Sequence, residues 1–171
     1  MTVSIRHAEA RDAAAIAEIY APYVRETAIS FEEVPPDDDE VARRIDDASE
    51  WIVAEEVGTI QGYAYAGVFN PRSAYRWSCE VSVYLDSGSR GRGLGRLLLA
   101  DLLDRLRAAG FVNAFAGIAL PNDASIGLFE SAGFHRVALY ESVGMKLARW
   151  HDVGWWQLRL REPTIPPDPL P

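Results

Sequence analysis

Arginines and glycines interleave in the segment Arg90-Gly91-Arg92-Gly93-Leu94-Gly95-Arg96. Glycines allow a tight turn and let an anion approach the backbone closely. The leucine-rich run 96–109 predicts a helix, and the N-terminus of a helix favours negative charge through its free N–H groups and its dipole. Guanidinium groups can add bidentate hydrogen bonds to phosphate oxygens. This combination predicts a binding site for a diphosphate.

Two other well-known phosphate-binding loops do not match this segment. A P-loop needs a Lys-Ser or Lys-Thr pair after its last glycine, and none follows here. The dinucleotide fingerprint Gly-x-Gly-x-x-Gly lies in a first strand-to-helix turn, whereas this segment lies mid-chain with a different glycine spacing. Arginine–glycine tracts that bind nucleic acid are long and disordered. A plain solvated loop and a nucleotide site remain as alternatives to a cofactor site.

Glu80 is the second candidate for chemistry. It interrupts the apolar or small residues of 77–81, in the strand-like stretch that leads into the glycine-rich segment. A carboxylate placed there costs desolvation energy unless it has a task or a partner. It could accept a proton from a substrate as a general base, or it could form an ion pair with Arg76 or another cation.

Hydrophobic periodicity predicts the elements that position these residues. We expect strands over residues 3–6, 51–55, 60–69, 77–85, 111–120, 134–140 and 155–160, and helices over 13–24, 35–48, 93–109 and 124–131. The apolar face of the third helix is expected to comprise Leu94, Leu97, Leu98, Leu102 and Leu106. Helices are too few to alternate strictly with strands, so an α/β (α+β) fold is predicted, with a mixed sheet and helices on both faces.

Composition limits the classes of protein to which the chain can belong. Its 171 residues, 49% hydrophobic and 25% charged, are typical of one globular domain. A net charge of −8 disfavours nucleic acid as a partner, and no apolar run approaches the ~20 residues that span a membrane. A single cysteine and no recognisable signal segment in residues 1–7 suit a cytoplasmic protein. We expect one domain over residues 1–162 and an extended proline-rich tail, 163–171, against a partner subunit.

The motif Arg90-x-x-Gly93-x-Gly95, between a strand and a helix, resembles the coenzyme A-binding motif of the GCN5-related N-acetyltransferases, the GNAT superfamily. The order of the predicted elements is that of the superfamily, and residues 122–134 resemble its later motif. Segments 73–80, 120–123 and 150–154 are similar to the phosphinothricin and the methionine sulfoximine/sulfone N-acetyltransferases. The resemblance covers about residues 5–160. It implies the GNAT fold, with a mostly antiparallel sheet of about seven strands.

Acetyl-CoA is the cosubstrate that the resemblance implies, with no metal. A splayed fourth strand would present its backbone to the cofactor, and one main-chain N–H there would stabilise negative charge on the thioester oxygen. The residues implied to bind the cofactor are Val83, Tyr84, Leu85, Arg90, Gly91, Arg92, Gly93, Leu94, Gly95, Arg96 and Asn122. Glu80 matches the strand glutamate of the family, which makes it the candidate base for the acceptor amine.

The implied acceptor is the α-amino group of a small amino acid or analogue such as phosphinothricin, methionine sulfoximine or methionine sulfone, acetylated directly in a ternary complex. Arg72 and Arg76 are predicted to bind it, since a guanidinium recognises a carboxylate at two points. Ser82 and Phe31 are further predicted substrate contacts, and a homodimer is implied. Another small amine, a peptide N-terminus, or a non-catalytic acyl-CoA sensor remain as alternatives.

One position departs from the family pattern. Many GNAT enzymes protonate the leaving thiolate with a tyrosine where this chain has Phe129, which cannot donate a proton. Tyr84 and Tyr140 are possible substitutes, and a thiolate whose conjugate acid has a pKa near ~8.5 can also leave without help. Cys79 is predicted to be a small core residue rather than a nucleophile.

Overall fold

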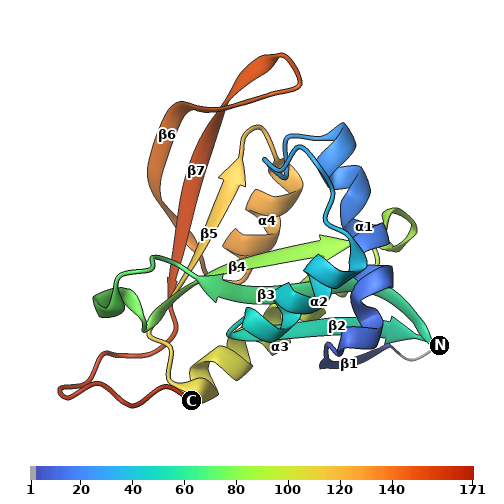
Figure 1. The fold of residues 1–171 in the computed structure, drawn as a ribbon. Helices are drawn as coiled ribbons and strands as arrows, with labels where there is room; N and C mark the ends of the chain where they lie inside the picture. Colours follow the sequence, from blue (N-terminus) through green and yellow to red (C-terminus); the bar gives the residue numbers. More distant parts are fainter. Residues whose placement is uncertain (1–2) are drawn as a thin grey trace.

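The computed structural model describes residues 3–171, so the first two residues of the predicted domain lie outside it (Figure 1). Its strands are β1 (Ser4–His7), β2 (Glu50–Glu56), β3 (Thr59–Val68), β4 (Ser78–Leu85), β5 (Asn113–Ala119), β6 (His135–Lys146) and β7 (Arg149–Arg159). Its α-helices are α1 (Ala13–Glu26), α2 (Asp38–Asp47), α3 (Leu94–Ala109) and α4 (Asp123–Ser131). The order of elements is the predicted one.

The strands form one mixed sheet in the order β1-β2-β3-β4-β5-β7-β6. Neighbouring strands are antiparallel except β4 and β5, which are parallel and pair only between residues 78–80 and 113–115. Beyond Glu80 these two strands diverge, which leaves the edge of β4 that faces β5 open over residues 81–85 (Figure 1). The predicted mixed, mostly antiparallel, seven-stranded sheet is confirmed.

Apolar cores lie on both faces of the sheet. On one face, the leucines of α3 pack with Ile52 of β2 and with Phe129 of α4. On the other face, α1 and α2 cover Trp51, Val53 and Tyr63. Successive residues of a strand point to opposite faces, which is why the neighbours Ile52 and Val53 belong to different cores. The prediction of helices on both faces is therefore confirmed.

Leu97 lies outside the buried stripe of α3, contrary to the prediction. Its exposed fraction is 53%, whereas Leu98 and Leu102 are fully buried. The stripe instead includes Leu99 and Leu103, which are 1% and 3% exposed. An α-helix has about 3.6 residues per turn, so successive side chains point roughly 100° apart, and one step in sequence can move a side chain from the edge of the buried stripe to the solvent. Leucine content alone does not locate that boundary.

Leu102→Ala is expected to lower the free energy of unfolding by about 2–5 kcal/mol, because it leaves a cavity in a packed core. Leu97→Ala, the same substitution on the exposed side of the same helix, should change it by less than about 0.5 kcal/mol. Urea denaturation of both variants measures the difference. Equal destabilisation by the two substitutions would contradict the described orientation of α3.

The last two strands are much longer than predicted and extend as a two-stranded ribbon away from the body of the sheet (Figure 1). Register shifts between Arg136 and Ala138 and between Tyr140 and Gly144 break the alternation of β6. A bulge of this kind removes the period of two on which strand prediction depends. Much of β6 is solvent-exposed on both faces, so burial does not impose a pattern there either.

The proline-rich tail packs on its own chain. The Nε1–H of Trp77 donates to the carbonyl of Asp168 (2.8 Å), and Leu170 packs against the α3 core. The predicted contact of the tail with a partner subunit stays a prediction. In residues 3–171, none of the helices is long and apolar enough to cross a membrane.

Candidate active site

The open edge of β4 forms one wall of the candidate cofactor site. Tyr23 of α1 reaches this edge, where its hydroxyl donates to the Leu85 carbonyl (2.7 Å) and accepts from the Leu85 N–H (3.3 Å). Backbone groups alternate in direction along a strand, so those of Val83 point the same way as those of Leu85. The amide of Val83 therefore faces the opening between β4 and β5.

A cavity of about 660 Å³ adjoins this edge, between α1 and the N-termini of α3 and α4. Most of the residues predicted to bind the cofactor line it, namely Val83, Leu85, Arg90, Gly91, Gly93, Gly95, Arg96 and Asn122. The strand, the glycine-rich segment and the start of α4 are far apart in sequence. The fold brings these three segments around one space.

The start of α3 is built to receive an anion. Gly91 and Gly93 have φ angles of 74° and 81°, in the left-handed region that glycine adopts without strain. The first bonds of the helix run from the N–H groups of Arg96 and Leu97 to the Gly93 carbonyl, at 3.1 and 3.2 Å. The N–H groups that precede them need partners from outside the helix, and a phosphate can supply such partners.

Three residues predicted to bind the cofactor direct their side chains elsewhere. Nη2 of Arg92 donates to both carboxylate oxygens of Glu56, at 2.9 and 3.0 Å. Leu94 is 2% exposed, and the ring of Tyr84 lies on the α1 face of the sheet, edge-on to Tyr23 with the ring centroids 5.1 Å apart. For these three residues, contact with the cofactor through the main chain stays a prediction.

Glu80 lies at the point where β4 and β5 separate. It is opposite Gly67 of β3 and Phe115 of β5, at the last position where β4 pairs on both sides. Alternation along the strand places its side chain on the same face as that of Tyr84, which packs under α1. Glu80 therefore points to the face covered by α1 and α2 and borders the opening that leads to the cofactor cavity.

The electrostatics of Glu80 suit a general base. Burial raises the pKa of its carboxyl above the ordinary range of a glutamate. Arg76, the ion-pair partner considered from the sequence, instead places its guanidinium 3.8 Å from the ring centroid of Trp77 and donates to the carbonyl of Ser73 (3.1 Å). A half-buried carboxyl with a raised pKa in this position is a functional candidate.

Of the four residues predicted to contact the acceptor, Ser82 is the one that strand pairing places on the same face of the sheet as Glu80. Ser82 follows Glu80 by two positions and shares its orientation. Phe31 is 41% exposed, and its ring packs so closely on Gly144 of β6 that a side chain there would collide with it. Arg72 is exposed in the connection between β3 and β4. Its contact with a substrate therefore stays a prediction.

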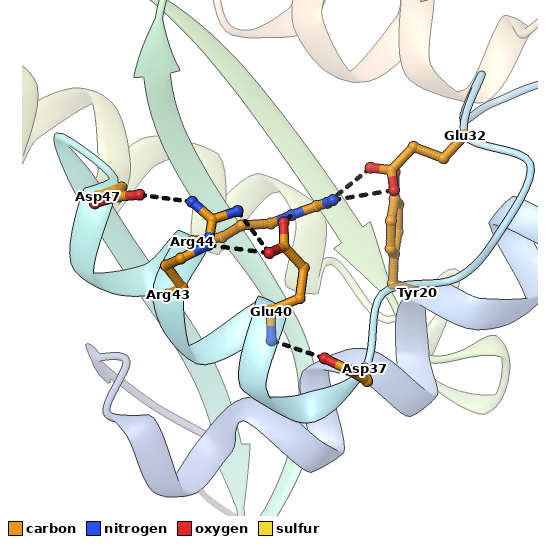
Figure 2. Close-up of polar contacts among 7 residues, drawn as sticks. All are labelled: Tyr20, Glu32, Asp37, Glu40, Arg43, Arg44 and Asp47. Atoms are coloured by element: carbon orange, nitrogen blue, oxygen red, sulfur yellow. Dashed lines mark hydrogen bonds and ion pairs between the residues drawn. The ribbon is translucent and has the colours of Figure 1, made fainter.

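An ion-pair network fixes the loop that contains Phe31. Arg44 of α2 donates to both carboxylate oxygens of Glu32 (2.7 and 3.1 Å), and the hydroxyl of Tyr20 donates to the same carboxylate at 3.0 Å (Figure 2). Asp37 caps α2 by accepting from the N–H of Glu40 (2.9 Å). The acidic run 37–40 therefore forms the N-terminus of a helix, as its composition predicts.

Tyr84 and Tyr140, the possible proton donors to the thiolate, do not line the described cofactor cavity, and neither does Phe129. Phe129 is in the core, edge-on to Phe134 with centroids 5.1 Å apart. Tyr140 lies on β6 and is 51% exposed. Burial raises the pKa of the Cys79 thiol to about 12, which keeps it protonated, as expected for a core residue.

Sequence reasoning missed several residues that line the cavity. Tyr23 stands out in the sequence only as an apolar position of a helix, and that pattern does not reveal a hydroxyl bound to another element. Ala124, Ser125 and Gly127 of α4 also line the cavity. Asn122 is the signal in the sequence that could have identified these residues of α4. Its side chain caps the helix by accepting from the Ser125 N–H (3.1 Å), so the first residues of the helix lie beside it.

The residues present fit acetyl-CoA. Arg90 and Arg96 offer positive charge at the start of α3 for phosphate groups, and the open backbone of β4 offers hydrogen bonds to an amide-bearing arm. A cavity of about 660 Å³ is within the usual size of cofactor sites.

Comparison with known proteins agrees with this geometry. Residues 5–155 match the acetyltransferase (GNAT) domain family. The chain is 37% identical to the phosphinothricin N-acetyltransferase of Streptomyces viridochromogenes, over 98% of this chain and 93% of that relative. It is 38% identical to the L-methionine sulfoximine/L-methionine sulfone acetyltransferase of Salmonella typhimurium, over 96% of this chain and 98% of that relative.

A solved structure gives the same result. The GNAT superfamily phosphinothricin acetyltransferase of Sinorhizobium meliloti, in complex with acetyl-CoA, superposes with a TM-score of 0.91 at 36% identity, covering 99% of this chain and 97% of that one. The chain therefore belongs to the GNAT acetyltransferase family, and the resemblance and fold predicted from its sequence are confirmed. It is an acetyltransferase that uses acetyl-CoA.

Proposed function

We propose that the protein acetylates the α-amino group of a small amino acid or analogue, with phosphinothricin, methionine sulfoximine and methionine sulfone as the leading acceptors. The observation that carries this proposal is the position of Glu80. Its half-buried carboxyl lies on the face of α1 and α2, at the point where β4 and β5 separate, and burial raises its pKa. The names of the relatives support the class of acceptor.

Each residue of the site has a role in this proposal. Acetyl-CoA supplies the acetyl thioester, while Arg90, Arg96 and the start of α3 hold its phosphates. The N–H of Val83 hydrogen-bonds to the thioester oxygen as negative charge develops there. Glu80 receives the proton of the acceptor amine. Transfer is direct: the amine nitrogen attacks the thioester carbon, the carbon–sulfur bond breaks, and CoA leaves as its thiolate. The one cysteine of the sequence, Cys79, does not serve as an acyl carrier, because it is buried and its thiol stays protonated.

The acceptor lies on the face of α1 and α2. Arg72 and Arg76 bind its carboxylate from the connection between β3 and β4, and a guanidinium is suited to this because it offers two parallel N–H donors. For this contact Arg76 has to leave the ring of Trp77, on which it stacks in the free protein. Ser82 and Phe31 border the acceptor from β4 and from the loop after α1. The domain that performs this reaction spans residues 1–162. The protein acts in the cytoplasm.

A thiol-release assay tests the proposed function. Purified protein and acetyl-CoA are combined with the three named analogues, with natural amino acids, with a polyamine and with a peptide N-terminus. We expect the highest kcat/KM for one of the three analogues. A polyamine or peptide as the best acceptor would contradict the proposal, and CoA binding without acetylation of any amine would favour the sensor alternative.

We further propose a homodimer formed through the β6–β7 ribbon. Val143, Met145 and Trp150 are 52%, 54% and 63% exposed, although they are large and apolar. Burying them against a second copy would remove this surface from water. Light scattering is expected to give a molar mass of about twice the 18.9 kDa of one chain. For the variant Trp150→Glu, the measured mass is expected to be that of a single chain.

A further inference from the structure

A second cavity lies on the face of the sheet to which Glu80 points. It has a volume of about 210 Å³ and lies between helices α1 and α2 and strands β2 and β3. We call it the Gly67 pocket and define it by Val41, Arg44, Trp51, Tyr63, Tyr65 and Gly67. One water molecule occupies roughly 30 Å³ in the liquid. The pocket therefore has the volume of several water molecules, which is enough for an amino acid side chain.

Strand pairing places this pocket beside Glu80. Gly67 is directly opposite Glu80 in the β3–β4 ladder, and Tyr65 is opposite Ser82. Residues that face each other across an antiparallel pair lie roughly 4.5–5.5 Å apart and point to the same face. The charge of Glu80 also contributes to the rise in the pKa of Tyr65, after burial. An amine held at Glu80 therefore has its own side chain within reach of the pocket.

The glycine at position 67 is explained by this space. Glycine inside a strand weakens the strand and often marks the close approach of a ligand. Its φ is not among the positive values of the described glycines, so the backbone does not require glycine there. A Cβ at this position would meet no atom within 4 Å, so no neighbour requires it either. The missing side chain leaves room that a bound molecule can use.

The walls of the pocket favour an uncharged occupant. Trp51 stacks on Tyr65 with the ring centroids 4.4 Å apart, which gives the pocket an aromatic floor. Arg44 at its rim is already neutralised, because its Nε donates to Glu40 (2.7 Å) and its Nη atoms donate to Glu32 (Figure 2). Asp47 also lines the pocket, and its carboxylate accepts from Arg43 (3.1 Å). An incoming anion would be repelled by Asp47 and would compete with Glu32 and Glu40 for Arg44.

We propose that the Gly67 pocket holds the side chain of the acceptor amino acid and selects an uncharged one. The uncharged side chain of methionine sulfone then binds more tightly than the anionic phosphinate side chain of phosphinothricin. This inference rests on the proposed function and names the part of the site that determines specificity. Gly67 is the residue that sets the size of the occupant.

Gly67→Val tests the pocket by filling it. Calorimetry of methionine sulfone added to the protein–CoA complex is expected to show a Kd about tenfold higher or more in this variant, since losing room for a methyl group in an apolar pocket costs 10–200-fold. The Kd for CoA should not change, because Gly67 does not line the described cofactor cavity. The unmodified protein should bind methionine sulfone at least about tenfold more tightly than phosphinothricin.

Val68→Leu is the matched control, because it adds bulk to the next residue of β3, which is 68% exposed and points to the opposite face. Gly67→Ala gives a smaller version of the change if the valine variant does not fold. Equal affinity of the unmodified protein and both Gly67 variants for methionine sulfone would overturn the pocket, and tighter binding of phosphinothricin would overturn its charge preference. A protein that binds CoA but none of these analogues would overturn the proposed function, and the pocket with it.

Discussion

Replacing Glu80 by glutamine is expected to lower kcat/KM about 10²–10⁴-fold at neutral pH, because an amide cannot take the proton of the acceptor amine. The affinity for CoA should stay the same, since the side chain of Glu80 points to the face of α1 and α2. Thiol-release kinetics and calorimetry measure the two quantities separately. Glu162→Gln, which removes a carboxylate whose side chain is 86% exposed, is the control and should be fully active.

The same variant makes a prediction about pH. Burial raises the pKa of Glu80, so the rate of the unmodified enzyme should fall as the pH drops through this raised pKa, above the ordinary ~4.3 of glutamate. A carboxyl whose pKa is raised by folding contributes stability that is fully present below its unfolded pKa and is lost as the pH rises through its folded pKa. Glu80→Gln should therefore be at least as stable at neutral pH, and unchanged turnover across the pH range would remove Glu80 as the base.

Replacing Arg90 or Arg96 by alanine is expected to raise the Kd for CoA about 10–100-fold, since a hydrogen bond to a charged group contributes about 1.5–3 kcal/mol. Both residues line the cofactor cavity at the start of α3. The loss should shrink as salt is added, because the interaction between the arginines and phosphate is screened. Calorimetry with CoA at low and high ionic strength measures both effects.

Arg92→Ala is the matched control for this series. It removes the same charge from the same turn, but the guanidinium of Arg92 is held by Glu56. We expect its Kd for CoA to stay within about fivefold of the original value, the effect of an exposed ion pair. An equal loss for all three arginines would show that the total charge of the turn, and not the lining of the cavity, determines affinity.

Much of the fold could be predicted from the sequence, because most of its elements have a buried side that imposes a period. The order of strands and helices and the mixed sheet follow from local patterns. The errors fall where burial gives no signal. Leu97 is a leucine on the exposed side of a helix, and the β6–β7 ribbon is exposed and interrupted by bulges.

The site divides in the same way. By itself, the sequence determined that the glycine-rich turn can bind an anion, because consecutive residues supply the left-handed glycines and the free N–H groups at the start of α3. The cofactor itself was implied by the resemblance to the GNAT family. Only the tertiary structure decided that Tyr23 reaches Leu85, that Arg92 turns to Glu56, and that Gly67 lies opposite Glu80. These contacts depend on strand register and helix packing between distant segments, which no local pattern of residues encodes.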